Sequence, residues 1–226
     1  MKIVFNSDLG ESPALASSGT QREILKRVQL ANVCCAQHAG NPELTQLTMN
    51  EVAAAGVRAG AHPGYPDREH FGRRSMFKNP FSAQDIVEMV AEQVAFARDA
   101  AKAAGLALYH VKAHGALYNE AAADGEVAEA IAQGVRLVAR DVFLVGLADS
   151  VMVGVFRRQG FVVLREAFAD RRYNSDGLLV PRNQPNAMIT DPNEARQQMG
   201  RLAKFSDTVC VHSDSPNVLK ILDGLI

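Results

Sequence analysis

The chain has 226 residues, of which 47% are hydrophobic and 22% charged, and its 24 basic and 25 acidic residues leave a formal net charge of −1. This composition is that of an ordinary globular protein and excludes a disordered chain, a coiled coil or a collagen-like repeat. Because no basic excess is present to neutralise phosphates, nucleic acid is not expected as a partner. The length suits a single α/β barrel of ~200–250 residues.

Short β-branched runs alternate with Ala-rich helical stretches along the whole chain. The predicted strands span Lys2–Asn6, Leu30–Cys34, Val57–Ala61, Leu108–Lys112, Val142–Gly146, Val162–Arg165 and Thr208–Val211. The predicted helices span Pro42–Ala55, Ser82–Ala104, Asp124–Ala139, Asp149–Gln159, Asp191–Lys204 and Ser215–Leu225. Brief strands separated by helices favour parallel pairing. No linker or fixed-period repeat divides the chain, which predicts a single domain over residues 1–226.

The N-terminus and the cysteines indicate a cytoplasmic protein with no membrane association. Only three apolar residues follow Lys2 before Asn6, too few for the apolar region of a signal peptide. Nowhere do about 18 apolar residues run together, so no membrane span is expected. The cysteines, with Cys34 and Cys35 adjacent, match neither a disulfide framework nor a zinc motif. We expect them to be small buried hydrophobes.

The positions of the polar residues distinguish a closed barrel from an open, doubly wound sheet. An open sheet gathers its site at one switch point, whereas a barrel collects site residues from the ends of many strands. Polar residues follow six of the predicted strands, at 6–11, 37–41, 60–68, 110–115, 166–172 and 212–214. This distribution favours a seven-stranded (β/α) barrel of the TIM type with one shared site.

Asp8, His38 and His62 are candidate ligands for a divalent metal. Carboxylate and neutral imidazole suit zinc, manganese or iron when three such groups converge. The three residues come from separate strands, however, and no local His-x-x-x-His pattern links them. A polar site without a metal therefore stays open as the alternative.

Lys112 and His114 are separated by one residue, so on an extended strand both side chains point to the same side. If that side is the barrel interior, Lys112 could stabilise a developing oxyanion or phosphoryl group, and His114 could transfer a proton. The alternative is a solvated strand end.

Two segments outside the strands are candidates for covering the site. Residues 64–74 combine Gly and Pro with Tyr65 and several charges, which is typical of a substrate-clamping loop. Its Arg68 and Arg73 could bind a carboxylate or phosphate, and a solvated loop is the alternative. Residues 173–182 predict a hairpin flap that turns at Asp176-Gly177.

Several common catalytic motifs are missing from the sequence. It contains no Gly-x-x-x-x-Gly-Lys-Ser/Thr phosphate loop, no Gly-x-Gly-x-x-Gly turn and no Gly-x-Ser-x-Gly elbow. Cys35 is a weak candidate nucleophile, because nothing local would lower its pKa.

The strand-end motifs, taken together and in order, resemble the LamB/YcsF family over almost the whole chain. The residues that carry the resemblance are Asn6–Glu11, Ala31–Cys35 with His38–Gly40, Gly60–Pro63, Pro66–Arg68 with Phe71–Arg73, His110–Asn119, Glu166–Arg171 and Leu179–Arg182.

The resemblance implies both a fold and an activity. The fold is a seven-stranded, TIM-like (β/α) barrel of the glycoside hydrolase/deacetylase superfamily. The activity is that of a cytoplasmic ATP-dependent 5-oxoprolinase, which opens the lactam of 5-oxoproline (pyroglutamate) to L-glutamate. The resemblance further implies two partner subunits, B and C.

A five-membered lactam is an unactivated amide, so its carbonyl must be phosphorylated or polarised before water attacks. The predicted catalytic residues are Asp8, His62, Lys112 and His114. The predicted substrate-binding residues are Glu11, Arg68, Arg73, Asp170, Arg182 and His212.

The chain departs from the usual family pattern at Ala36, Gln37, Asn41, Ala113 and Ser213. These departures keep open a different lactam or cyclic amide as the substrate. A second function is a free-standing metal-dependent amide hydrolase or deacetylase, and a third is a non-catalytic scaffold.

Overall fold

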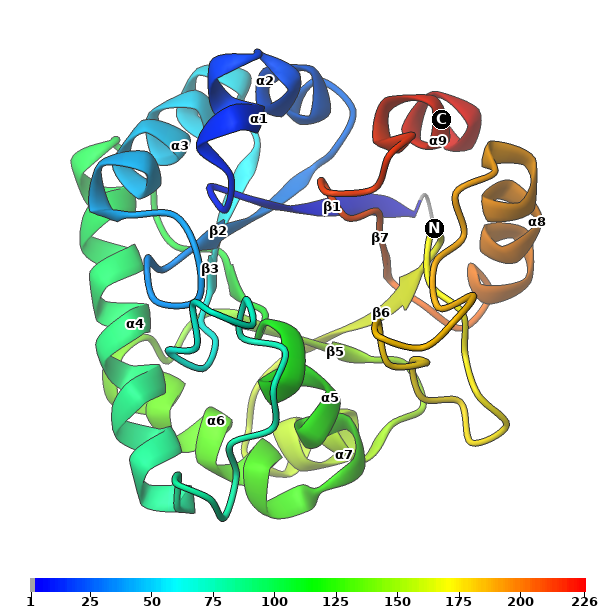
Figure 1. Cartoon of the computed structure of the whole chain (residues 1–226). Coiled ribbons are helices and arrows are strands. Elements are labelled where there is room, and N and C mark those ends of the chain that lie inside the picture. Colours follow the sequence, from blue (N-terminus) through cyan, green and yellow to red (C-terminus); the bar gives the residue numbers. More distant parts are fainter. Residues whose placement is uncertain (1–2) are drawn as a thin grey trace.

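The strands pair in chain order and close into a barrel in the computed structural model, which describes residues 3–226 (Figure 1). They are β1 (Val4–Leu9), β2 (Leu30–Cys34), β3 (Arg58–His62), β4 (His110–Val111), β5 (Phe143–Leu147), β6 (Val163–Phe168) and β7 (Thr208–Cys210). Each strand pairs in parallel with the next, and β7 returns to β1 with Val209 opposite Phe5. The predicted seven-stranded TIM-like barrel is thus confirmed.

The helices form an outer layer around the barrel (Figure 1). They are α1 (Pro13–Ser17), α2 (Thr20–Leu25), α3 (Pro42–Ala55), α4 (Ala83–Ala103), α5 (Gly115–Ala123), α6 (Gly125–Val138), α7 (Val151–Arg158), α8 (Pro192–Leu202) and α9 (Val218–Leu225). Six of these match the predicted helices, whereas α1, α2 and α5 were not predicted because each is short and follows a turn directly. Within residues 3–226, no helix has the length and apolar character needed to cross a membrane.

The observed strands differ from the predicted ones mainly at their ends. β1 continues to Leu9 and β6 to Phe168, past the polar residues at which the predictions stopped. The added residues include Asp8 and Glu166, which stay in the strands because their buried side chains contact Lys112 in the barrel interior. The predicted start of β1 at Lys2 lies outside the described residues. β4 is only two residues long, although the backbone N–H of Lys112 still donates to Ala61 on β3.

A polar network occupies the barrel interior, where barrels usually carry apolar layers. The Nδ2 group of Asn6 donates to Thr208 Oγ1 at 2.9 Å, and that of Asn32 donates to Asn6 Oδ1 at 2.8 Å. His110 Nε2 contacts Asn32 Oδ1 at 2.7 Å. All four residues are buried, and these hydrogen bonds join them into one layer that supports the groups above it.

The alternate residues of the strands face the helices and are apolar. Phe5, Val33, Ala61, Val111 and Val209 all belong to the hydrophobic core between barrel and helices. Burial of both strand faces is what parallel sheets require, and here the two faces differ in character: apolar outside, polar inside.

Residues 173–182 fold back on themselves between β6 and α8. Tyr173 and Leu179 form an isolated antiparallel bridge, and the backbone N–H of Asn174 donates to Leu178. The segment contributes Leu179, Pro181 and Arg182 to the lining of the main cavity.

Gly60 gives the polar interior its space. It pairs with Asn32 on one side and His110 on the other, and a β-carbon at this position would overlap the His110 imidazole. We expect Gly60→Ala to lower the free energy of unfolding by about 1–3 kcal/mol, measured by chemical denaturation, because the imidazole cannot move without leaving Asn32.

Gly200→Ala is the matched control, because nothing lies within 4 Å of a β-carbon added there on α8. It should be neutral or stabilising by up to about 1 kcal/mol. Equal stability of Gly60→Ala and the unmodified protein would contradict the role assigned to Gly60.

Candidate active site

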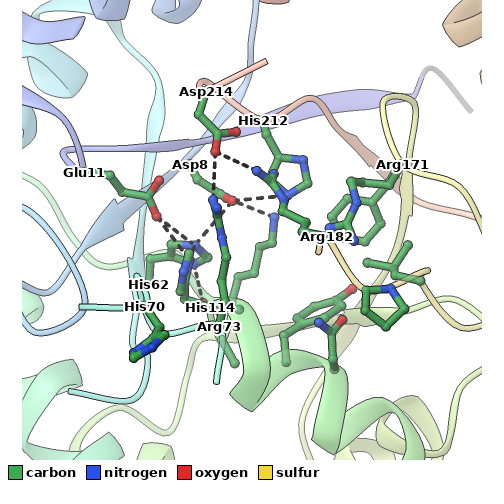
Figure 2. A pocket seen from close by; sticks show the side chains of 18 of the residues that line it. Asp8, Glu11, His62, His70, Arg73, His114, Arg171, Arg182, His212 and Asp214 are labelled. Carbon is green, nitrogen blue, oxygen red and sulfur yellow. Dashed lines mark hydrogen bonds and ion pairs between the residues drawn. The ribbon is translucent and has the colours of Figure 1, made fainter. Parts of the chain in front are cut away.

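A cavity of about 610 Å³ opens at the carboxyl ends of the strands (Figure 2). Asp8 of β1, His62 of β3 and Phe168 of β6 lie in its wall, together with Lys112 and His212 from just beyond β4 and β7. The volume is within the range of ~300–1,000 Å³ typical of small-molecule sites. It lies on the face where barrel enzymes keep their active sites.

A buried ammonium anchors the base of this cavity. Lys112 Nζ lies 3.0 Å from both Asp8 Oδ1 and Glu166 Oε1, with Asn6 Oδ1 at 3.3 Å and Cys210 Sγ at 3.2 Å. Burial alone would lower the pKa of Lys112, but Asp8 and Glu166 outweigh it and hold that pKa well above the ordinary value. The three N–H bonds of the ammonium are thus occupied by protein acceptors.

Asp8 is oriented by its neighbours so that one carboxylate oxygen faces the cavity. Oδ1 accepts from Asn32 Nδ2 at 2.7 Å and from Lys112, whereas Oδ2 lies 3.4 Å from His62 Nε2 and 3.8 Å from His212 Nε2. Burial opposes ionisation of Asp8, but His62 and Lys112 keep its pKa well below the ordinary value. Asp8 is therefore a carboxylate at neutral pH.

His110 fixes the orientation of Asn32 beneath Asp8. Burial, assisted by the charge on Lys112, lowers the pKa of His110 to about 3, so its imidazole is neutral. Its Nε2–H donates to the Asn32 carbonyl oxygen, which leaves the Asn32 amide nitrogen to face Asp8. Neither residue was singled out from the sequence, because only the register of β2 with β3 and β4 places them under Asp8.

A second buried group, the His/Glu cluster, consists of Glu11, His38, His62 and His114. One ligand atom from each lies within 4.8 Å of all the others. Glu11 Oε1 is 3.0 Å from His38 Nε2 and 3.1 Å from His114 Nδ1. Burial raises the pKa of Glu11, but His114 and His38 outweigh this and hold it well below the ordinary value.

The proton positions in the His/Glu cluster suit a metal ion. His62 Nδ1 contacts the Lys112 carbonyl at 2.7 Å and His114 Nε2 contacts the Phe71 carbonyl at 2.9 Å, so these nitrogens carry the hydrogens. The other two nitrogens, His62 Nε2 and His114 Nδ1, then face each other with their lone pairs at 3.0 Å. A proton or a metal ion shared between them would remove this repulsion. Ligating histidines are typically oriented in this way by backbone carbonyls.

The predicted ligand set changes in one respect. His38 and His62 do lie together, but Glu11 and His114 join them instead of Asp8, which belongs to a separate group with Cys210 and His212. The predicted set of Asp8, His38 and His62 is thus divided between two neighbouring groups of candidate ligands. Spacing could not decide between Asp8 and Glu11, because Asp8 lies near the end of β1 and Glu11 only two residues beyond it.

His212 and Asp170 form an oriented pair on the other side of Asp8. Both carboxylate oxygens of Asp170 lie 3.0 Å from His212 Nδ1, and Oδ2 also accepts from the His212 backbone N–H. His212 Nδ1 therefore carries the hydrogen, and its Nε2 is an acceptor that faces Asp8 (Figure 2). The ring stacks on Phe168 at 5.4 Å, which holds its plane.

The remaining predicted residues divide into two groups. Arg73 and Arg182 line the cavity, and both donate to Asp214 Oδ2. Arg68 does not line the cavity. Its Nη2 donates to the carbonyl oxygens of Ala36 and Gly40, so Arg68 links two loops and is not placed to contact a substrate in this cavity, as had been predicted. Arg171 and Asp214 line the cavity but were not predicted.

The departures from the family pattern mostly lie away from the cavity. Ala113 lines it, whereas Ala36, Gln37, Asn41 and Ser213 do not. Asn41 caps α3 by accepting from Leu44 N–H. Ala36 has a φ of 61°, a left-handed conformation that favours glycine.

The three cysteines are buried and unpaired. Burial raises the pKa of Cys35 to about 12, and Cys35 does not line the main cavity, so it has no thiolate to offer as a nucleophile.

Fold and site together define a barrel protein with a carboxylate, oriented histidines and a potential metal cluster at its catalytic face. The chain belongs to the LamB/YcsF family, whose model matches residues 3–225. It is 41% identical to the 5-oxoprolinase A subunit of Tolumonas auensis, over 96% of this chain and 91% of that protein.

Solved structures agree with this assignment. The chain is 37% identical to the lactam utilization protein of Thermus thermophilus, with a TM-score of 0.87 over 100% of this chain and 96% of the other. A putative cellobiose-phosphate cleavage protein of Enterococcus faecalis, at 11% identity and TM-score 0.61 over 99% and 89% of the chains, shares the fold alone.

The neutral state of His110 predicts a specific pH dependence of stability. Between about pH 6.5 and 3 the unfolded chain binds a proton at His110 that the folded protein does not, so stability decreases as pH falls through this window. His110→Gln keeps a donor to Asn32 but does not titrate, and should show a shallower decrease in denaturation experiments across this range. Identical pH dependences would contradict a neutral His110.

The His/Glu cluster predicts divalent-metal binding. Loss of a residue that only supports a metal ligand lowers metal affinity by about 10–100-fold. Glu11 and His114 are candidate ligands themselves, so Glu11→Gln and His114→Asn should each lower metal affinity by at least this factor, measured as metal content after equilibrium dialysis. His70→Asn is the control, because His70 lines the cavity but lies outside the cluster. Equal metal uptake by all variants, or none by the unmodified chain, would contradict the metal site.

Proposed function

We propose that this chain provides the lactam-opening site of an ATP-dependent 5-oxoprolinase, acting in the cytoplasm with two partner subunits of the B and C types. The reaction converts 5-oxoproline to L-glutamate. Membership of the LamB/YcsF family supports the proposal, as do relatives of similar length named as the A subunit of 5-oxoprolinase. Free, buried cysteines are compatible with a reducing compartment.

The observation that carries the proposal is the pair of proton acceptors at the cavity floor. Asp8 Oδ2 and His212 Nε2 face each other at 3.8 Å, and each is fixed from behind, Asp8 by Asn32 and Lys112 and His212 by Asp170. A water molecule between them would be held and could lose a proton to either group.

Ring opening then requires few steps. The water oxygen bonds to the lactam carbonyl carbon, the carbon–nitrogen bond breaks, and the ring nitrogen receives a proton, which yields an amine and a carboxylate. In the proposed complex, ATP activates the amide by phosphorylating the lactam oxygen, with ADP as the leaving group. Breaking the carbon–nitrogen bond of the phosphorylated species then leaves an acyl phosphate, which a second water molecule hydrolyses to the carboxylate and inorganic phosphate. His212 suits both proton steps, because Asp170 stabilises its protonated form.

Lys112 acts in this scheme as a positioning residue and not as an electrophile. Its N–H bonds already have acceptors in Asn6, Asp8 and Cys210, and Glu166 pairs with its charge, so it keeps Asp8 ionised and oriented. This role differs from the sequence-based hypothesis that Lys112 polarises the carbonyl.

The His/Glu cluster would hold a divalent ion through Glu11, His38, His62 and His114. Such an ion would supply Lewis-acid polarisation of a carbonyl or phosphoryl oxygen. A proton shared between His62 and His114 is the other way to satisfy their facing nitrogens, and it would present a hydrogen-bonding edge toward Asp8.

The same cluster supports a second candidate function, a metal-dependent amide hydrolase that needs neither ATP nor partners. Catalytic zinc takes three protein ligands, often histidines with or without a glutamate, and keeps one position for water, and this cluster can supply such a set. ATP dependence separates this candidate from the first.

Reconstitution of the three subunits tests the proposal. We expect 5-oxoproline-dependent ATP hydrolysis and glutamate formation only when this chain is combined with its B- and C-type partners. Asp8→Asn and Lys112→Met should each lower turnover by at least about 100-fold, since positioned acid–base groups typically contribute 10²–10⁴-fold.

Lys220→Met, at an exposed position on α9, is the matched control and should retain full turnover. Hydrolysis of lactams or acetylated amides by the chain alone without ATP would favour the second candidate. Undiminished turnover of Asp8→Asn in the complex would refute the site assignment.

A further inference from the structure

Three guanidinium groups, those of Arg73, Arg171 and Arg182, line the cavity. Figure 2 shows Arg171 and Arg182 on the side away from Glu11, His62 and His114, with His212 between the two sides. They come from different segments: Arg73 follows β3, Arg171 follows β6 and Arg182 ends the flap, residues 173–182. The cavity therefore has a cationic side opposite the His/Glu cluster.

Two of these guanidinium groups have enclosed N–H groups without an acceptor among the described residues. Arg171 is 4% exposed; its Nη2 donates to the Val180 carbonyl at 2.6 Å, but its Nε has no partner. Arg182 Nη1 donates to Asp214 at 2.6 Å, and its Nη2 has no partner. A buried charged donor without an acceptor is costly, and most such groups in proteins bind a ligand or water.

The charges around these arginines are incompletely balanced. Asp170 is the nearest buried carboxylate in sequence, but both of its oxygens already bind His212. Asp214 shares a single oxygen between Arg73 and Arg182. Burial, followed by the like charge of Arg182, lowers the pKa of Arg171 to about 10. An added anion would relieve this repulsion.

We propose that Arg171 and Arg182 form an oxyanion subsite that binds the carboxylate of the lactam substrate, with a phosphoryl group of ATP as the other source of the same chemistry. The planar guanidinium fork matches a carboxylate or phosphate in two-point contact. This inference rests on the proposed function for the identity of the ligand.

The subsite also sets the orientation of the substrate. Arg171 and Arg182 line the same cavity as Asp8 and His212, which Asp170 orients, so a bound oxyanion shares this cavity with the proton acceptors. A lactam held by its carboxylate at Arg171 directs its ring toward His212 and Asp8. Lactams without a carboxylate lose this anchor, so Arg171 determines specificity for acidic lactams.

Kinetics of the complete three-subunit complex test the subsite. Arg171→Met should raise KM for 5-oxoproline at least 10-fold and leave KM for 2-pyrrolidinone, the same lactam without the carboxylate, unchanged. If the oxyanion is phosphoryl, KM for ATP and inhibition by inorganic phosphate should change instead. Equal effects on both lactams, or no effect on any of these quantities, would overturn the subsite.

Arg172→Met is the matched control, because Arg172 pairs with Glu194 and does not line the cavity. Arg171→Lys keeps the positive charge but loses the two-point contact that a guanidinium makes. This variant replaces Arg171→Met in the same measurements if Arg171→Met does not fold. Calorimetric binding of 5-oxoproline and of inorganic phosphate to the isolated chain gives a readout independent of turnover. Binding that Arg171→Lys weakens would support the subsite even if ATP-dependent activity is absent, and no binding of either probe would overturn it.

Discussion

The buried ammonium of Lys112 is the interaction on which the site depends. It follows β4 and contacts Asn6 and Asp8 of β1, Glu166 of β6 and Cys210 of β7, so one cation joins strands on opposite sides of the barrel. Loss of one partner from a buried ion pair typically costs about 3–5 kcal/mol, because it leaves an uncompensated charge. The geometry of Asp8 is thus determined by the same contacts that stabilise the barrel interior.

The polar side chains of the barrel interior also divide the cavity into chemically distinct parts. Glu11 and the histidines of the His/Glu cluster form one side, where a metal or a shared proton can stabilise negative charge. Asp8 and His212 form the floor, where a proton can be accepted. Arg171 and Arg182 form the far side, where an anion can be held. A small acidic lactam needs all three functions at once: an anchor, a base and carbonyl activation.

Local sequence signals predicted the elements well where capping chemistry is explicit. The bounds of α3 were predicted correctly because Asn41 caps it, Pro42 occupies its first position and Gly56 ends it in the left-handed conformation. The strand ends were less predictable, because polar residues such as Asp8 and Glu166 mark the end of a strand in most sheets, whereas here they face a polar barrel interior. The spacing of apolar residues along a strand indicates that the strand is buried, but it does not show whether the side facing the barrel interior is polar.

The site residues were predictable as a set, and their grouping was not. The alternation of strands and helices already implied that the strand-end histidines meet on one face. Which carboxylate joins them depends on side-chain direction at the end of β1, where Asp8 points toward Lys112 and Glu11, just beyond the strand, reaches the histidines. Likewise, the sequence singled out Arg68 and not Arg171, because a charge-rich loop is more visible than one arginine after a strand.

An experimental structure of the chain with 5-oxoproline bound would test the central claim most directly. We expect the lactam to occupy the 610 Å³ cavity with its ring carbonyl beside Asp8 and His212 and its carboxylate on Arg171 and Arg182. A lactam bound outside this cavity, or one whose carboxylate faces the His/Glu cluster, would contradict that claim.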